Sequence, residues 1–534
     1  MSIDLREKAR ARLAAEQCAV RINRAAPVRF ALAYPNAYRV GISSLGFQLV
    51  YRMINDCADA SCERVFLPDP EDLKLHERTG TELFTLESQS PLSEFDVVGF
   101  STAFEMDYLN VLRMLRLARI PIRSTERDDS HPLVIAGGPC ATLNPEPLAD
   151  FIDAFVIGDA EDIIARLAAL ILLHRSESRA NRLAALAGLP GVYVPSVSRA
   201  PVRAVCRSLS NYLQDSCIAS PEGEFGRIDL IEVGRGCGRG CRFCATGWVN
   251  RPPRFRDLPD RIESRRLGLI GAAVFDHPRA ADLCRRIVAS GGEFTVSSLR
   301  LETVTPEVAK LLAAGGQKTL TIAPEAGTQR LRRVIGKECG DDQIVAAVDA
   351  ARSAGLRKVK LYFMIGLPTE TDADVDSIAD LLTRLAAEFP SIDLEASVST
   401  FVPKPWTPFQ WHPMEREPVL KKRFARLAGR LAAIRRIEFG GESPRLAIVQ
   451  GILARGDRQV GRLLEAALDN GGDYRAAIRE SGIDVDWYAH RPRSIDEVLP
   501  WEFIDAGIDR ACLWSEYRSA LRDRDPGADE ADCV

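Results

Sequence analysis

The sequence predicts an α/β protein: an N-terminal doubly wound, Rossmann-like parallel sheet, a second set of β–α units, and a helical C-terminal region. Two observations support this. Short apolar runs alternate with helical stretches over residues 28–173, and the same alternation returns over residues 228–400. Strands that alternate with helices form parallel sheets covered on both faces. The expected divisions are an α/β domain over 1–195, a linker over 196–222, a core over 223–414 and a helical region over 415–534.

Composition and length are those of a globular protein with several domains. The chain has 534 residues, with 46% hydrophobic and 27% charged residues. Its formal net charge of −4 provides no general attraction for nucleic acid. No apolar run is long enough to span a bilayer, and the charged start is unlike a signal peptide. The 13 cysteines follow no regular framework, so we expect a cytoplasmic protein with reduced thiols.

In the first domain, a charged helix over residues 2–19 precedes the first expected strand. The expected strands are residues 28–34, 97–100, 133–136 and 154–157, and the expected helices are 45–55, 108–118 and 161–173. Several strands end in glycines, at Gly99, Gly137, Gly138 and Gly158. Ligands of open α/β sheets bind beyond the carboxyl ends of strands, where glycine permits close backbone approach. The glycines are equally compatible with tight turns.

Three cysteines, Cys237, Cys241 and Cys244, lie within eight residues directly after the apolar run 228–233. The glycines at 234, 236, 238 and 240 allow the backbone between them to turn sharply. Three thiols that can face one point indicate a metal site.

Zinc fits this pattern poorly, because a structural zinc site has four ligands, commonly in two separated pairs. His277 and Cys284 are the nearest further candidates, and neither has a partner at ligand spacing. A disulfide is disfavoured because the other cysteines are scattered and nothing marks the chain as secreted. Soft thiolates instead favour an iron–sulfur cluster.

The spacing Cys-x3-Cys-x2-Cys, with Phe243 before the last cysteine, resembles the signature of the radical S-adenosylmethionine (SAM) superfamily. In that family the three cysteines hold three irons of a [4Fe–4S] cluster, and the fourth iron binds the amino and carboxylate groups of SAM. The resemblance implies Cys237, Cys241 and Cys244 as metal ligands and SAM as a cofactor. It also implies an external electron donor of the flavodoxin or ferredoxin type, whose electron cleaves SAM to methionine and a 5′-deoxyadenosyl radical.

The β–α units after the cysteines resemble the partial (β/α)6 barrel of this superfamily, whose active face lies at the carboxyl ends of the strands. The expected strands are residues 269–275, 294–299, 318–323, 358–364 and 394–400. The resemblance places seven residues near SAM: Phe243, Gly268, Gly271, Ser297, Arg300, Glu325 and Gly366. The family's usual Gly-Gly-Glu is not intact here. Residues 401–411, fixed by prolines as extended, end the barrel with aromatic side chains that could cover the site.

The N-terminal domain resembles the cobalamin-binding domain of the B12-dependent radical SAM class, with one departure. The Asp-x-His-x-x-Gly signature, whose histidine ligates cobalt, is absent from the loop at 35–41, and His131 is expected at the surface. Cobalamin is therefore a candidate cofactor without a histidine ligand. The alternative is a domain that has kept the fold and recognises substrate.

Four segments resemble an uncharacterised subgroup of radical SAM proteins with this N-terminal domain: residues 34–41, 136–147, 455–458 and 499–501. The expected function is reductive SAM cleavage, with cobalamin-dependent methylation of carbon as one outcome. An RNA-modifying relative of methylthiotransferases is the alternative. The basic residues at 421–423 and 435–436 lack interleaved aromatics, which favours a solvated face over a nucleic-acid contact without excluding that partner. A non-catalytic cluster carrier would leave the SAM-facing positions unexplained. The pattern identifies neither the substrate nor further catalytic residues.

Overall fold

The computed structural model describes residues 3–197, 200–212, 214–259 and 264–522, and the chain divides into two compact units. The N-terminal unit consists of Met1–Ile231, Ile452–Val485 and Val498–Gly507. The barrel unit consists of Glu232–Gly451, Asp486–Glu497 and Ile508–Val534. The helical C-terminal region is thus shared between the two units.

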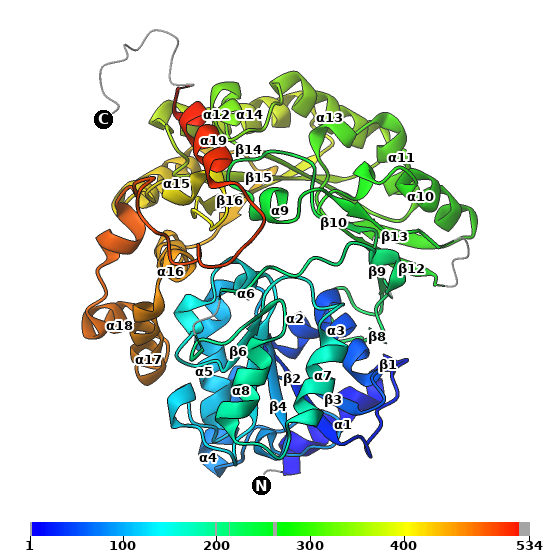
Figure 1. Ribbon diagram of the computed structural model, residues 1–534. Coiled ribbons are helices and arrows are strands. Elements are labelled where there is room, and N and C mark those ends of the chain that lie inside the picture. Colours follow the sequence, from blue (N-terminus) through cyan, green and yellow to red (C-terminus); the bar gives the residue numbers. More distant parts are fainter. Residues whose placement is uncertain (1–2, 198–199, 213, 260–263, 523–534) are drawn as a thin grey trace. The chain divides into compact units, whose positions relative to one another are not determined.

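The N-terminal unit is built on a six-stranded sheet in the order β3-β2-β4-β5-β6-β7 (Figure 1). The five strands from β3 to β6 run parallel, and β7 is antiparallel. A separate small pair joins β1 and β8. The strands are β1 (Gln17–Cys18), β2 (Val28–Ala37), β3 (Ala60–Leu67), β4 (Val97–Ser101), β5 (Leu133–Gly137), β6 (Ala154–Val156), β7 (Val192–Tyr193) and β8 (Ile218–Ala219).

Helices cover both faces of this sheet, so the expected doubly wound arrangement is confirmed. On one face, α3 and α7 pack together into a core that includes Phe47, Leu32 and Leu167. On the other, α5 packs against α17, which comes from the C-terminal part of the chain. The helices are α1 (Ile3–Ala15), α2 (Tyr38–Ile42), α3 (Leu45–Asn55), α4 (Pro70–Thr79), α5 (Tyr108–Leu117), α6 (Pro139–Leu143), α7 (Ile164–Leu173), α8 (Arg179–Ala187), α17 (Gly461–Asp469) and α18 (Tyr474–Ser481).

Strand β3 was not expected, because Glu63 and Arg64 interrupt its apolar run. Both side chains are buried in the structure. Arg64 forms ion pairs with Glu16 (2.7 Å) and Glu87 (2.6 Å), and Glu63 accepts hydrogen bonds from Thr85 and Ser88. Partners far away in sequence therefore allow charged residues in the sheet.

The two larger sheets of the barrel unit have the orders β13-β12-β9 and β14-β15-β16-β17, and a parallel bridge between Leu299 and Ile322 joins them. The pairs β12–β13, β14–β15, β15–β16 and β16–β17 are parallel, as the barrel prediction requires. The main strands are β9 (Asp229–Glu232), β12 (Arg266–Ile270), β13 (Glu293–Val296), β14 (Thr319–Glu325), β15 (Lys358–Ile365), β16 (Asp393–Thr400) and β17 (Ile437–Gly441).

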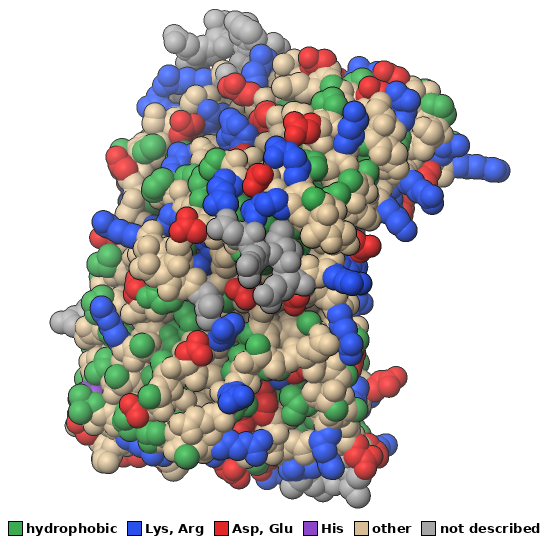
Figure 2. All heavy atoms as spheres, turned by 90° about the vertical axis from the view of Figure 1, so that its right-hand side faces the viewer, with side chains coloured by type: hydrophobic (Ala, Val, Ile, Leu, Met, Phe, Trp, Pro, Cys, Tyr) green, Lys and Arg blue, Asp and Glu red, His purple; other side chains and the backbone are tan. Residues whose placement is uncertain are grey.

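Helices alternate with these strands, and a last helix, α19, ends the described chain (Figure 1). They are α9 (Ala245–Val249), α10 (Ala280–Ala289), α11 (Pro306–Ala314), α12 (Gln329–Val334), α13 (Asp341–Ser353), α14 (Asp372–Glu388), α15 (Glu417–Leu431), α16 (Pro444–Arg455) and α19 (Arg510–Arg522). No helix in the described ranges is long and apolar enough to cross a membrane. On the face shown in Figure 2, acidic and basic side chains are interspersed over each unit.

Three local expectations were wrong. The strand expected over residues 269–275 ends at Ile270, and Val274–Asp276 form a 3-10 turn instead. The helical region expected from residue 415 is interrupted, because α15 ends at Leu431 and Ile437–Gly441 form β17, which pairs with β16. The segment 401–411 is not extended throughout, because Pro408–Trp411 form a 3-10 turn whose aromatic rings are buried. Trp411 packs edge-on against Trp514 of α19, so long-range packing decided this turn.

Candidate functional site

The cysteine loop lies between two short paired strands and a helix. Strand β10 (Gly234–Arg235) pairs with β11 (Arg254–Phe255), and the loop leads from β10 into α9, with Cys244 as the residue that precedes the helix. Gly236 has a φ of +91°, and a Cβ there would overlap the carbonyl oxygen of Asn250. Only glycine fits this turn, as the glycine-rich sequence predicts.

Hydrogen bonds fix the backbone between the cysteines. The indole Nε1 of Trp248 donates to the carbonyl of Cys241 (3.0 Å), and the N–H of Cys244 donates to the same oxygen (3.1 Å). The guanidinium of Arg251 lies over the Trp248 ring, 4.9 Å from its centre. Trp248, which the sequence analysis did not single out, therefore supports the loop from the side of α9.

Arg242 fastens the loop from its other side. Its Nη1 donates to the carbonyls of Arg333 (3.0 Å) and Val334 (2.9 Å), and its backbone N–H donates to the carbonyl of Ile335 (2.9 Å). Gly336 then passes so close that a Cβ would lie 2.7 Å from the carbonyl oxygen of Gly240. The segment that follows α12 is consequently held against the cysteine loop.

The donor set of this loop fits an iron–sulfur cluster. Cys237, Cys241 and Cys244 are free thiols of intermediate exposure. Burial raises the pKa of Cys241 to about 11, while Lys337 lowers it and the other two thiols raise it. Among the described residues no three His, Cys, Asp or Glu side chains converge tightly enough for one metal ion. A four-iron cluster separates its thiolates more widely than a single ion does, and its irons favour their ionised form.

Glu325 lies beside this loop and is paired with a cation that the sequence analysis missed. It is the last residue of β14, at a break in the β14–β15 register, with a φ of +70°. Its Oε1 accepts a hydrogen bond from Lys337 Nζ at 3.2 Å, and the two side chains are only 15% and 18% exposed. Burial raises the pKa of Glu325, and Lys337 opposes this. No motif or spacing marks Lys337.

Three other predicted SAM residues lie at the same, carboxyl edge of the parallel strands. Gly271 follows β12, Ser297 follows β13 and Gly366 follows β15. Gly366 has a φ of +82° and donates its N–H to the buried carboxylate of Glu370 (2.6 Å). Glu370 in turn pairs with Arg423 at 2.9 Å, so Gly366 also has a structural role in the turn.

The remaining three predicted SAM residues occupy other kinds of position. Gly268 is inside β12, opposite Thr295 of β13. Arg300 forms an ion pair with Asp276, beside a small cavity that both residues line. Phe243 is half-buried within the cysteine loop.

The two residues considered as further zinc ligands, His277 and Cys284, have other structural roles. The ring Nε2 of His277 lies 2.9 Å from the carbonyl of Arg256, and its Nδ1 accepts the N–H of Arg279 (3.0 Å). Cys284 is fully buried in α10. Both residues thus have roles in the fold.

In the N-terminal unit, the strand order reverses direction between β2 and β4, which is where ligands of doubly wound sheets bind. Asn36, the second-last residue of β2, donates from Nδ2 to Asp107 Oδ1 (2.8 Å), and Asn110 donates to the carbonyl of Pro35 (2.9 Å). Burial raises the pKa of Asp107 to about 6. His131 is partly exposed and bonded to Asp128, as expected of a surface residue.

Of the four glycines predicted at strand ends, Gly99 lies within β4 and Gly137 ends β5, both with ordinary contacts, whereas Gly138 and Gly158 are approached closely by the protein's own backbone. A Cβ on Gly138 would lie 2.7 Å from the carbonyl oxygen of Thr102, and one on Gly158 would overlap that of Ala204. Both glycines have positive φ. The close approach that the sequence indicated is therefore made by the protein's own backbone.

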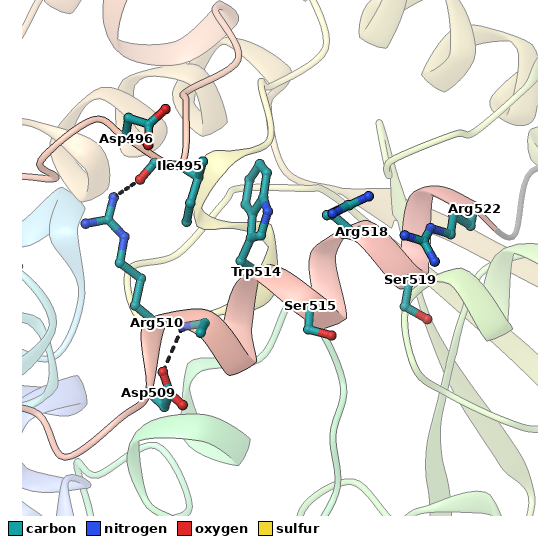
Figure 3. Close-up of a pocket in the computed structure, with 10 residues that line it drawn as sticks. Ile495, Asp496, Asp509, Arg510, Trp514, Ser515, Arg518, Ser519 and Arg522 are labelled. Carbon is teal, nitrogen blue, oxygen red and sulfur yellow. Dashed lines mark hydrogen bonds between the residues drawn. The ribbon is translucent and has the colours of Figure 1, made fainter. Parts of the chain in front are cut away.

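A separate hollow of about 920 Å³ runs along α19 (Figure 3). Trp514 and Arg518 point to one side of the helix, and Ser515 and Ser519 point to the other. At its start, Arg510 donates to the carbonyls of Ile495 and Glu497. The lining includes none of the predicted cofactor residues.

Comparison with known proteins identifies the family. Residues 46–195 match the family described as "Radical SAM proteins, N-terminal", and residues 231–382 match the "Radical SAM superfamily". An uncharacterised protein of Methanocaldococcus jannaschii is 30% identical over 450 residues, which are 82% of this chain and 90% of that protein. The chain belongs to the radical SAM superfamily.

Solved structures of radical SAM proteins share the fold of both units. The radical SAM methyltransferase TsrM of Kitasatospora setae, solved with cobalamin and a [4Fe-4S] cluster, matches with a TM-score of 0.55 and 15% identity. The match covers 86% of this chain and 99% of that chain. The cobalamin-dependent radical SAM enzyme OxsB, solved with aqua-cobalamin and SAM, matches with a TM-score of 0.51 and 11% identity over 93% and 80% of the two chains. The radical SAM fold predicted from the sequence is thus confirmed.

Proposed function

We propose that this protein reductively cleaves SAM at a [4Fe–4S] cluster held by Cys237, Cys241 and Cys244. The observation that carries the proposal is the placement of three partly exposed thiols on one braced loop after the first barrel strand. When bound, the cluster supplies the electron for SAM cleavage, and an external donor of the flavodoxin or ferredoxin type restores it.

The protein's own part is to position these groups and to exclude water. Trp248 and Arg242 brace the loop from two sides. Gly271, Ser297 and Gly366 present backbone at the carboxyl edge, where the methionine and adenine parts of SAM would lie. The mostly buried surroundings of Cys241 and Glu325 lower the local dielectric, which strengthens each interaction.

The test is anaerobic reconstitution with iron and sulfide, followed by addition of SAM and dithionite. The wild-type protein should bind one [4Fe–4S] cluster and form methionine and 5′-deoxyadenosine. A protein in which all three loop cysteines are Ala should form neither. Iron content near that of the wild type in this variant would contradict the proposal.

Cobalamin-dependent methyl transfer is the second candidate reaction, supported by the fold shared with TsrM and by the reversal of strand order in the N-terminal unit. The loop at residues 35–41 offers no imidazole, and Asn36 is bonded to Asp107. We therefore expect cobalamin, if bound, to have no protein histidine on cobalt. Electron paramagnetic resonance of protein loaded with cob(II)alamin checks this, because superhyperfine splitting from an imidazole nitrogen of the protein would refute it.

If desalting removes all cobalamin from the protein, the result would favour the alternative hypothesis, in which the N-terminal unit recognises substrate. RNA is a poorer candidate for that substrate, because most basic residues of α15 already have acidic partners: Lys421, Arg423, Arg426 and Arg430. Lys421 pairs with Glu417, and Arg423 is buried against Glu370. These ion pairs neutralise basic charges that an RNA backbone would otherwise contact.

A further inference from the structure

We propose that Glu325 and Lys337 form a charge pair that sets the reduction potential of the cluster, with Lys337 favouring the reduced form and Glu325 opposing it. This inference rests on the proposed function, since it concerns the cluster of the cysteine loop. It assigns Lys337 a positioning and electrostatic role that no cysteine spacing reveals.

The first step is the position of Lys337. The preceding residue, Gly336, packs against the carbonyl of Gly240, and Ile335 accepts the backbone N–H of Arg242. Gly240 and Arg242 are the two neighbours of Cys241. Lys337 is therefore brought next to Cys241 by contacts on both sides of that cysteine.

The second step is the rigidity of the pair. Arg332, which is fully buried, donates to the carbonyls of Ala326 (2.9 Å) and Gly327 (3.0 Å), directly after Glu325. The same guanidinium donates to the carbonyl of Cys339 (3.2 Å), two residues after Lys337. One arginine thus holds together the two backbone segments that carry the pair, so the 3.2 Å contact between Nζ and Oε1 is braced independently of the cluster.

The third step is the sign of the effect. A cluster gains one negative charge on reduction, so a nearby cation stabilises the reduced form and a nearby anion destabilises it. Both side chains are mostly buried, and water screens such charges weakly. The net potential should then depend on the difference between two opposing contributions.

A purely structural salt bridge would behave differently. It would fasten β14 to the segment after α12, and loss of either partner would loosen the cysteine loop in the same way. The electrostatic role requires shifts of opposite sign from the two partners. This difference separates the two interpretations.

The experiment compares Lys337→Met, Glu325→Gln, the double variant and Lys337→Arg in the full, reconstituted protein. Lys310→Met is the matched control, because Lys310 is exposed on α11. Iron and sulfide content, thermal unfolding and the cluster's midpoint potential are measured, the last by redox titration followed by electron paramagnetic resonance. None of these readouts depends on turnover.

We expect a more negative midpoint potential in Lys337→Met and a more positive one in Glu325→Gln, each with wild-type iron content. The double variant should return toward the wild type, and Lys337→Arg and Lys310→Met should match it. Shifts of the same sign, no shift, or loss of iron from both single variants would overturn the charge-pair proposal alone. Failure of the wild-type protein to hold a cluster would overturn the proposed function as well.

Discussion

The cysteine loop and the carboxyl edge of the N-terminal sheet are both regions where strands end in turns that need glycine, yet only the loop carries a cluster of thiols beside such a turn. In the loop, Gly236 lets the chain turn so that thiols remain partly exposed. At the sheet edge, Gly138 and Gly158 admit the carbonyls of Thr102 and Ala204. At all three glycines the protein's own backbone makes the close approach, so the thiols beside the turn, and not the glycine itself, distinguish the loop.

The largest expected effect is on the loop itself. Changing Cys237, Cys241 and Cys244 together to Ala should abolish iron binding, because in the proposed site each supplies a thiolate to the cluster. The N-terminal unit should remain folded, which circular dichroism and thermal unfolding can check. Cys512→Ser, at an exposed thiol of α19, is the control and should keep full iron content.

The same comparison extends to thiols outside the loop. Cys140, Cys284 and Cys339 are buried, and we expect them to be dispensable for the cluster. Iron counts above one [4Fe–4S] cluster per chain that fall when these cysteines are replaced would show that a second cluster exists.

Two glycine variants test whether the regions differ as described. Gly236→Ala and Gly158→Ala each force a Cβ into a carbonyl at positive φ and should each cost about 1–3 kcal/mol of stability from strain alone. Only Gly236→Ala should also reduce iron retained after desalting. Gly240→Ala is the control within the loop, because its Cβ would have room and no positive φ is required. Equal iron loss in the Gly158 and Gly236 variants would contradict the prediction that only the cysteine loop affects iron binding.

Asp107 provides a pH test at the sheet edge. Burial raises the pKa of Asp107 from 3.8 to about 6, so the folded protein binds this proton more tightly than the unfolded chain does. Its contribution to stability is complete below pH 3.8 and is lost as the pH rises through about 6, by about 3 kcal/mol in total. Asp107→Asn should flatten the pH dependence of the melting temperature across this window and leave iron content unchanged. An unaltered pH profile would count against the buried carboxyl as its cause.

The smallest effect expected is that of Trp248→Phe, which removes the indole hydrogen bond to the carbonyl of Cys241 and keeps an aromatic ring. The loss should be about 1 kcal/mol, seen as faster loss of iron to a chelator at unchanged total iron. A chelation rate equal to that of the wild type would mean that Arg242 alone suffices to brace the loop.

Sequence periodicity was enough to predict the alternating strands and helices, since most strands are apolar runs bounded by turns. It failed at β3, where Arg64 is neutralised by Glu16 and Glu87 from distant segments, and at β17, whose pairing with β16 overrode a helical pattern. The cysteine loop could be recognised from the sequence because its three thiols lie within eight residues of one another, and their role as cluster ligands stays a prediction. Lys337 was not, because it meets Cys241 and Glu325 only through folding.

The sharing of the C-terminal chain between the two units has a practical consequence for dissecting the protein. Helix α17 contributes buried leucines to the N-terminal unit and packs on α5, although about 340 residues separate Leu117, the end of α5, from Gly461, the start of α17. A fragment that stops at Ile231 would leave that face of α5 uncovered, and a fragment that begins at Glu232 would carry α17 without its partner. Neither unit can be cut out as a continuous piece with its core intact, so functions should be separated by point substitution in the whole chain and not by truncation.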